Sequence, residues 1–126
     1  MERTGMTTGS IMMVLAIVLG AMGAHALKAV LSIEELTSYE TAVKYQVYHA
    51  LAFLILSNKK GFSKGVYAFM ISGVILFSGS IYLLVLDRSM GMDFSSIGFT
   101  TPVGGVLLII SWSLLVINIL REKSTK

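Results

Sequence analysis

Apolar residues gather in four stretches that are long enough to cross a lipid bilayer as helices. A hydrocarbon layer of about 30 Å is crossed by about 20 helical residues, each of which rises about 1.5 Å. The pattern predicts four helices, at about residues 7–27, 33–57, 65–86 and 102–120. We therefore expect residues 1–126 to form one domain, an all-α integral membrane four-helix bundle.

The first stretch has two interpretations. Arg3, the apolar run Ile11–Leu19 and the tripeptide Ala24-His25-Ala26 match a secretory signal peptide that ends in an A-x-A cleavage site. The apolar character continues through Gly20–Leu27, however, and Gly20 and Ala24 have the small-residue spacing that lets membrane helices approach closely. We therefore expect a retained helix rather than a removed signal.

The second helix has a complete start signal in its sequence. Ser32 is the expected N-cap, Glu35 is its capping-box partner, and Leu31 and Leu36 form the hydrophobic staple. The first half of the helix is amphipathic, whereas the second half is wholly apolar. The helix is therefore expected to begin in water or among headgroups and to continue to about Ser57.

The last helix carries an inward seam. Thr101 is its expected N-cap and Pro102 its first helical residue. Positions that alternate by four and three predict the face that packs on the protein, with Trp112 beside it; they are Gly104, Leu108, Ser111, Leu115 and Asn118. Across the chain, the glycines expected to allow close helix packing are Gly20, Gly23, Gly79, Gly104 and Gly105.

Polar residues enter the apolar pattern between residues 40 and 50. At about 100° per residue, Tyr45, Gln46 and His49 share one arc, and Glu40 and Lys44 share the opposite one. The charged pair has the favourable acid-before-base spacing of four and is interpreted as a surface pair. The other three must face protein, because an unpaired polar group in hydrocarbon costs several kcal/mol.

These positions define the candidate site, a buried polar cluster in the outer half of the helices. Its expected members are His25, Tyr45, Gln46, His49, Ser78, Ser80, Tyr82 and Thr101. We predict hydrogen bonds from Tyr45, Gln46 and His49 to the backbone or to hydroxyls of the third and fourth helices, with Ser78, Ser80 and Thr101 as the expected partners. Whether the two histidines meet is left open by the sequence.

Composition narrows the class of protein. The chain is 55% hydrophobic and 13% charged, whereas a typical soluble domain is about 25% charged. The absence of cysteine excludes disulfides, thiolate catalysis and cysteine-based metal sites. The net charge of +3 is divided among segments that flank the predicted helices, so no nucleic-acid partner is expected.

The basic residues also predict an orientation. A cytoplasmic loop with Lys59, Lys60 and Lys64 places both termini in the cytoplasm, together with seven of the ten Lys and Arg residues. Five of the seven acidic residues then lie outside. The expected topology is N-in/C-in. The three lysines are also candidate contacts for anionic lipid headgroups, although topology determination explains them equally well.

Two kinds of chemistry are weighed against plain packing. His25 and His49 suggest a metal site or a proton relay, but two histidines without cysteine are a poor ligand set. Ser78, beside Gly79 and Ser80, suggests a hydrolase together with His49, but no nucleophile-elbow motif is present. We therefore expect no metal, no cofactor and no catalytic residues, and the protein is not expected to be an enzyme.

Four motifs resemble a known family. They are GAMGAHALK (Gly20–Lys28), ETAVKYQVYHALA (Glu40–Ala52), FSGSIYLL (Phe77–Leu84) and TPVGG (Thr101–Gly105) followed by Trp112. In this order they resemble the YgdD/YwdK family of small bacterial membrane proteins, a domain of unknown function that is similar to a eukaryotic small transmembrane protein family. Met22 and Ser111 depart from the pattern, which favours an aromatic residue and a glycine there. The resemblance implies four transmembrane helices and a multi-pass bacterial plasma-membrane location, and it implies no activity, cofactor or catalytic residue.

The function predicted from the sequence is therefore association rather than chemistry. We expect a small membrane protein that associates with lipids, with other membrane proteins or as a homo-oligomer, and that supports membrane or envelope integrity. The alternative is an oligomeric transporter or channel for a small solute or ion, such as a proton, which uses the His49 face. Four helices of this size fill their own centre with side chains, so such a pore would lie between protomers.

Overall fold

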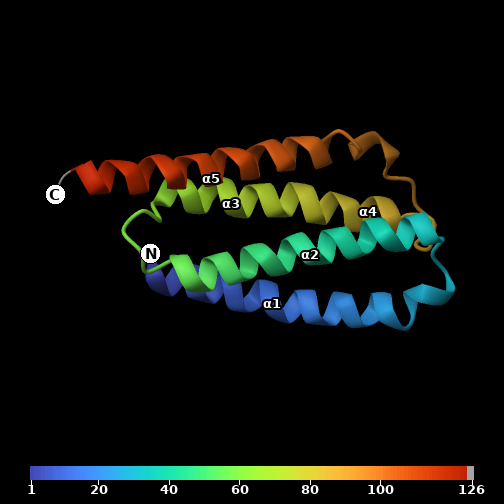
Figure 1. The fold of residues 1–126 in the computed structure, drawn as a ribbon. Helices are drawn as coiled ribbons and strands as arrows, with labels where there is room; N and C mark the ends of the chain where they lie inside the picture. The colour runs from blue at the N-terminus through green and yellow to red at the C-terminus, as the bar shows by residue number, and fades with distance from the viewer. Residues whose placement is uncertain (125–126) are drawn as a thin grey trace.

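The computed structural model describes residues 1–124 of the chain, with side chains described as far as residue 122, and shows an all-α fold (Figure 1). The described residues form four long helical runs. They are α1 (Glu2–Ala24), α2 (Ile33–Leu56), a continuous run of α3 (Lys64–Val74), η2 (Ile75–Gly79) and α4 (Ser80–Leu86), and α5 (Thr100–Ser124). Short 3-10 turns, η1 (Leu27–Ala29) and η3 (Ser95–Ile97), lie in the connections. The prediction of an all-α chain is confirmed.

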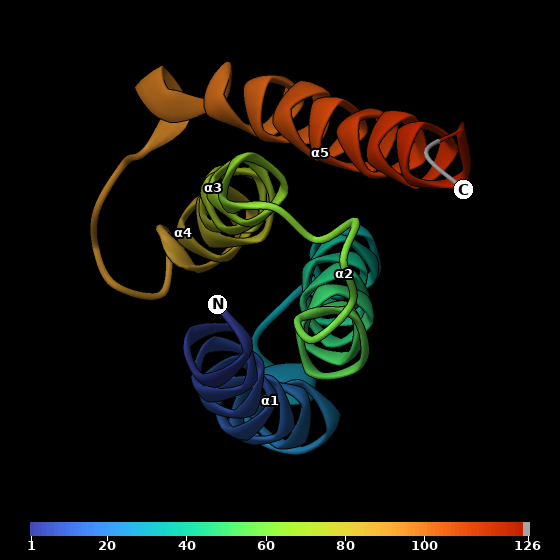
Figure 2. The same ribbon diagram turned by 90° about the vertical axis from the view of Figure 1, so that its left-hand side faces the viewer.

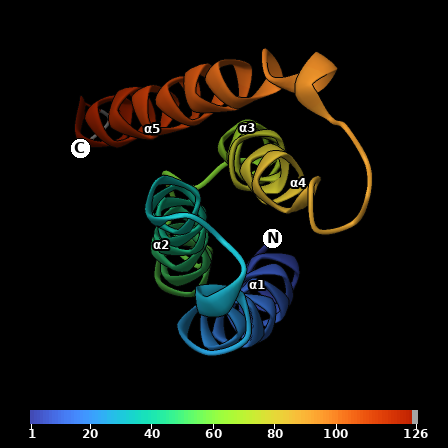
Figure 3. The same cartoon turned by 90° about the vertical axis from the view of Figure 1, so that its right-hand side faces the viewer.

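The helical runs are arranged as two pairs. The most extensive contacts join α1 to α2 and α3 to α5, and the pairs meet where α2 packs on η2 and α4. In the views along the helices, α1 and α5 lie at opposite ends of this arrangement (Figures 2 and 3). The closed four-helix bundle and its N-in/C-in orientation remain predictions.

Three of the described runs are long and apolar enough to cross a membrane: Glu2–Ala24, Lys64–Leu86 and Ser95–Glu122. The sequence pattern also predicts a membrane span at α2. This helix is long enough, but it is not apolar enough to meet the same standard. The difference lies in its first half, where Glu34, Glu35, Glu40 and Lys44 lower the hydropathy. α2 nevertheless packs lengthwise on α1 and lies beside the other runs (Figure 1).

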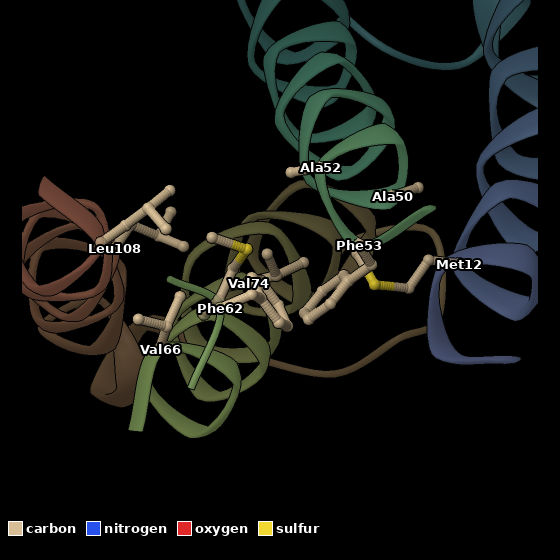
Figure 4. Close-up of a cluster of buried hydrophobic side chains, with 10 residues drawn as sticks. Met12, Ala50, Ala52, Phe53, Phe62, Val66, Val74 and Leu108 are labelled. Atoms are coloured by element: carbon tan, nitrogen blue, oxygen red, sulfur yellow. The ribbon is translucent and has the colours of Figure 1, made fainter. Parts of the chain in front are cut away.

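The main apolar core lies where α2, α3 and α5 meet (Figure 4). Phe53 of α2 is fully buried and contacts the ring of Phe62 edge-on, with the ring centroids 5.9 Å apart. Val66 and Met70 of α3 are equally inaccessible. A second cluster, around Tyr39, lies toward the opposite end of the molecule. In lipid such contacts stabilise through close packing, because hydrocarbon surrounds the helices on the outside as well.

The start of α2 agrees with its sequence signal. The Ser32 hydroxyl accepts a hydrogen bond from the Glu35 backbone N–H at 3.1 Å, and the Glu35 carboxylate accepts one from the Ser32 N–H at 2.9 Å. Leu31 is buried and Leu36 packs in the same cluster, as a hydrophobic staple requires. Both predictions are confirmed, because a helix cap depends only on residues that are close in sequence.

The seam of α5 is also confirmed, whereas its cap is not. Gly104, Leu108, Ser111 and Leu115 are buried, and Asn118 is half-buried against the α2–α3 turn, where its amide donates to the Gly61 carbonyl. The predicted N-cap, Thr101, instead lies inside the first turn of α5, which begins at Thr100. Pro102, the third residue of α5, is compatible with this earlier start. Proline has no backbone N–H, and the N–H groups in the first turn of a helix have no partner within the helix.

A single π turn, η2, interrupts the third run where α5 comes closest. A Cβ placed on Gly104 would overlap the backbone of Phe77 and would lie 2.7 Å from the carbonyl carbon of Leu76. Gly23 likewise faces the ring of Tyr39. These two packing glycines agree with the sequence pattern. Gly20 and Gly105 make ordinary contacts with Val43 and Phe77.

Gly79 does not serve as a packing glycine. A Cβ at this position would meet nothing within 4 Å, because Gly79 lies at the end of η2 and turns away from α5. Gly5, in contrast, does serve as a packing glycine. A Cβ there would overlap the side chain of Ser57. Its sequence surroundings are polar, so the apolar pattern does not single it out.

Candidate functional site

Gln46 is the polar residue that connects the largest number of helices. It is buried on α2, and its amide Nε2 donates to the Met12 carbonyl of α1 at 2.8 Å. The Tyr82 hydroxyl of α4 donates to its Oε1 at 2.6 Å. An amide side chain offers both donors and an acceptor, and this one uses both kinds to join three helices.

Tyr39 and Ser78 also donate to backbone carbonyls of neighbouring helices. The Tyr39 hydroxyl donates to the Leu19 carbonyl at 2.5 Å, and the Ser78 hydroxyl in η2 donates to the Ala42 carbonyl at 2.8 Å. A carbonyl oxygen has two lone pairs, so it accepts these bonds in addition to its own helical bond. Tyr39 also packs on Tyr82, with ring centroids 5.4 Å apart. This layer ties α2 to α1 on one side and to η2 on the other.

His49 belongs to a separate connection, between α2 and α5. Its Nε2 accepts from the indole N–H of Trp112 at 3.0 Å, and its Nδ1 lies 2.7 Å from the Tyr45 carbonyl. An indole only donates and a carbonyl only accepts. We therefore assign the neutral tautomer with the proton on Nδ1, from the hydrogen-bond network. In this state both ring nitrogens of His49 are occupied.

A third connection ties α4 to the start of α5. The hydroxyls of Ser80 and Thr101 lie 2.5 Å apart, and Ser80 also lies within 3.0 Å of the Phe77 carbonyl, to which it donates. Because Ser80 gives its proton to that carbonyl, Thr101 is the donor between the two hydroxyls.

The predicted cluster is therefore divided into separate connections. Gln46 and Tyr82 are brought together, as are Ser80 and Thr101, but neither pair contacts His49. The partners expected for His49 are wrong, because η2 turns Ser78 toward Ala42 and α5 places Trp112 against the imidazole. His25 ends α1 as its exposed C-cap, on a different element from the buried His49.

Tyr45 is only partly covered by protein, although the sequence pattern predicts that it faces protein. Its side chain is exposed, and its ring packs on Phe77 with centroids 4.8 Å apart.

Met12, Leu19 and Ala42 contribute to these hydrogen bonds only through their backbone carbonyls, which the residue type does not indicate in a sequence. The sequence pattern places Trp112 beside the seam of α5, but it does not predict that Trp112 pairs with His49.

The arrangement contains the parts of no familiar catalytic constellation in the portion that the structure describes. The Ser78 and Ser80 hydroxyls bond to other groups, so neither has His49 as a base within reach. No three His, Asp or Glu side chains gather closely enough there to hold a metal ion. Each buried side-chain nitrogen or oxygen among the described residues has a hydrogen-bond partner. What the polar side chains do in this structure is hold helices together.

Comparison with known families identifies the family to which the chain belongs. The profile described as "Protein of unknown function (DUF423)" matches residues 19–105. This chain belongs to the DUF423 family. The match covers the end of α1, all of α2 and the run from α3 to α4, and it stops just after the closest approach of Gly104 to η2.

Relatives of this DUF423 chain are named membrane proteins. It is 39% identical over 115 residues to the UPF0382 membrane protein SAB0533 of Staphylococcus aureus, which covers 86% of this chain and 88% of the relative. It is 36% identical over 115 residues to the UPF0382 membrane protein YwdK of Bacillus subtilis, covering 86% and 89%. It is 35% identical over 112 residues to the UPF0382 inner membrane protein YgdD of Escherichia coli, covering 85% and 82%. No solved structure matches the chain. The resemblance found in its sequence motifs is therefore confirmed, and the chain is a membrane protein.

Grooves open on the outside of this DUF423 fold, and two of them border α2. A groove of about 540 Å³ between α2 and α5 is bordered by Tyr45, His49 and Trp112. A second, of about 340 Å³, lies between α1 and α2, where Gly20 and Gly23 face Glu40, Lys44 and Tyr48. Both volumes are in the range of small-ligand sites, about 300–1,000 Å³, but both open sideways, as contacts with lipid or with another helix require.

Proposed function

We propose that this protein is a non-enzymatic, multi-pass protein of the bacterial plasma membrane that acts by lateral association with lipids and other membrane proteins. In this role it supports the integrity of the membrane and envelope. The observation that carries the proposal is that the described buried polar groups are all paired within the chain. The grooves on either side of α2 open on outward faces, and Glu40 and Lys44 border one of them. These surfaces are therefore available to neighbours in the membrane.

The end of the molecule that holds the α2–α3 turn supports a contact with lipid. Lys59, Lys60 and Lys64 are exposed there. Lys59 and Lys60 border a groove of about 540 Å³ that reaches the apolar side chains of Leu115 and Ile119. Basic groups above an apolar groove suit an anionic phospholipid, and each adds about 1 kcal/mol of attraction near an anionic surface. The role of these lysines remains part of the proposal.

The alternative, an oligomeric transporter or proton channel, would use the groove beside His49. In the described conformation a proton relay through His49 requires that the bond from Trp112 be released, because a protonated imidazole cannot accept it. The structural role of His49 needs no such step. The two functions therefore differ in what they require of one side chain.

A reconstitution experiment separates them. Purified protein is incorporated into liposomes that contain a pH-sensitive dye, and a pH step is applied to the wild-type protein and to His49→Leu. We expect no proton flux above that of empty liposomes from either. A flux that the wild-type protein carries and that His49→Leu abolishes would overturn the proposal in favour of transport.

Complementation provides the second arm. A strain that lacks the gene is challenged with envelope stress, namely detergent or osmotic shock, and then supplied with wild-type protein or His49→Leu. We expect sensitivity in the deletion strain and rescue by both forms. A deletion strain that withstands these stresses as well as its parent would contradict the role in envelope integrity.

A further inference from the structure

One face of α2 is exposed along its whole length. Its exposed members are Ile33, Thr37, Glu40, Lys44, Tyr48, Leu51 and Ile55. From Ile33 to Lys44 they alternate by four and three, the spacing that forms the seam of a left-handed coiled coil. We call this face the α2 seam. Figures 2 and 3 show α2 at one side of the assembly, so another helix can approach it.

The α2 seam carries two charges, Glu40 and Lys44. The ion pair between Arg88 and Glu35, 2.8 Å apart, has exposed Arg88 at the aqueous end of α2. From Glu35, Glu40 and Lys44 lie about 7.5 and 13.5 Å further along the helix axis. With α2 taken as a membrane span, as the sequence predicts, a headgroup layer of about 5–8 Å that begins at Glu35 places Glu40 at the edge of the hydrocarbon and the backbone of Lys44 inside it.

Neither charged side chain has a partner among the residues whose side chains the structure describes. Among residues 1–122, Glu40 and Lys44 form no ion pair or hydrogen bond, with each other or with any neighbour. Ionised side chains in the apolar layer are rare and normally pair with one another or face protein. These two are instead exposed at the border of the α1–α2 groove. This surface is therefore incomplete in a single copy.

We propose that a second copy of this chain covers the α2 seam, so that Lys44 of each protomer pairs with Glu40 of the partner subunit. The proposal rests on the lateral association proposed above and names its partner. The two α2 helices run parallel about a twofold axis along the membrane normal. Such an axis makes the interface self-complementary, so one pairing is formed twice.

The geometry of a helix favours this pairing. Side chains on α2 lean toward its N-terminal end, so the Lys44 ammonium group reaches toward the depth of Glu40. A parallel partner places its own Glu40 at that depth. The same side chain in a single copy can only extend toward the headgroups.

Apolar residues complete the seam on either side of the charges. Ile33 is 85% exposed and Ile55 61% exposed, so both side chains are available to a neighbouring helix. A polar pair inside an otherwise apolar seam fixes which register two helices adopt, as buried polar residues do in coiled coils. The adjacent groove beside Gly20 and Gly23 has room for the exposed ring of Tyr48 from the partner subunit.

Disulfide crosslinking in native membranes tests the contact, and the chain contains no cysteine of its own to interfere. Two differently tagged copies of Thr37→Cys, which lies on the α2 seam, are expressed together and oxidised. We expect a disulfide-linked dimer that carries both tags. Ile117→Cys on α5, equally exposed to lipid but on another helix, is the matched control and should give none.

Charge reversal then separates pairing between copies from pairing within one helix. Glu40→Lys alone and Lys44→Glu alone place like charges together, and each should lower the Thr37→Cys crosslink by about tenfold. Expressed together, the two single variants restore opposite charges only across the interface, and their mixed crosslink should recover to near the wild-type yield. Glu34→Lys has the same change of charge outside the seam, and it should leave the yield unchanged.

Three results would overturn the proposal. They are a wild-type Thr37→Cys protein that forms no crosslink between copies, single reversals that crosslink as well as wild type, and a mixture that fails to recover while both variants are folded. The last result would indicate an ion pair within one α2 helix. If the reversed variants are degraded, Glu40→Gln and Lys44→Gln take their place, and crosslink yields equal to wild type in both would overturn it. A monomer that carries no proton flux and still rescues the deletion strain would leave the proposed function intact.

Discussion

Gln46 and His49 lie three residues apart on α2, yet they serve different neighbours. Gln46 joins α1 and α4, whereas His49 joins α5 through Trp112. Hydrogen bonds between membrane helices contribute about 0.6 kcal/mol on average and about 1.7 kcal/mol at most. These side chains therefore adjust how the helices fit, and no single one of them is expected to hold the fold together.

The pairing of His49 and Trp112 predicts a measurable coupling. His49→Leu leaves the indole N–H of Trp112 without its partner, whereas Trp112→Phe removes the donor and leaves Nε2 of His49 free. The double variant removes both polar groups, so we expect it to be less destabilised than the sum of the two single variants, by about 0.6 kcal/mol. Unfolding in mixed detergent micelles measures all four proteins. Strictly additive effects would show that the bond contributes nothing.

The capping box at the aqueous end of α2 predicts a dependence on pH. Hydrogen bonding from the Ser32 backbone N–H, together with Arg88, lowers the pKa of the exposed Glu35 carboxylate below its ordinary value of 4.5. A group whose pKa is lower in the folded state stabilises the fold above pH 4.5 and loses this contribution as the pH falls below it. We therefore expect the unfolding temperature to fall on acidification in the wild-type protein.

Glu35→Gln is the matched comparison for this effect. It keeps a side chain that can accept the bond from Ser32 but has no carboxylate to titrate. Its unfolding temperature should change less with pH over the same range. Equal slopes in the two proteins would mean that other carboxylates account for the acid sensitivity.

At the residue scale, the sequence indicates which side chains face protein but not which partners they meet. Gln46 is predictable as an inward residue, because an amide in an apolar helix needs a partner. Its acceptor on α1 is the carbonyl of Met12, and that choice depends on how far α1 slides along α2. This register is set by how the side chains of the two helices pack together, and no local pattern in the sequence shows it.

At the scale of the elements, α5 packs directly against the backbone of η2. Gly104→Ala would force a methyl group onto the backbone of Phe77 and Leu76. Backbone cannot rotate away as a side chain does, so we expect a loss of about 1–3 kcal/mol in the free energy of unfolding. Thermal unfolding in detergent measures the change.

Gly79→Ala is the control for this prediction. A methyl group there meets nothing within 4 Å, and alanine favours a helix over glycine by about 1 kcal/mol. The variant should therefore be as stable as the wild-type protein or slightly more stable. If Gly79→Ala were the more damaging of the two, the packing of α5 on η2 would have to be reconsidered.

The elements differ in how well sequence predicts them. The start of α2 follows from Ser32 and Glu35 alone, because both halves of the capping box are local. The π turn Ile75–Gly79 has no such signal. It lies where Gly104 allows α5 to pack against the backbone of Leu76 and Phe77. Such a contact between distant segments leaves no local pattern in either segment.

At the scale of the whole molecule, the two ends differ in charge. The start of α1 and the last described turn of α5 lie at the end that holds the α2–α3 turn, with Arg3, Lys59, Lys60, Lys64 and Arg121 (Figure 1). Glu34, Glu35, Asp87 and Asp93 belong to the connections at the other end. The positive-inside rule therefore predicts that the termini are cytoplasmic.

Cysteine labelling tests this orientation without interference, since the chain has no cysteine. Ser63→Cys, in the basic turn, and Ser95→Cys, in the loop between α4 and α5, are introduced singly. In intact cells an impermeant thiol reagent should label Ser95→Cys, and Ser63→Cys should be labelled only after the cells are opened. The reverse pattern would show that the protein lies the other way round.

The bond between Trp112 and His49 also gives the molecule an optical signal of its own. Trp112 is the single tryptophan of the chain, so all of its intrinsic indole emission originates beside the imidazole of His49. Indole emission responds to the polarity and hydrogen bonding of its surroundings. A protein observed without any attached dye therefore reports whether α5 is seated against α2, and a change in colour or intensity marks the separation of the two helix pairs.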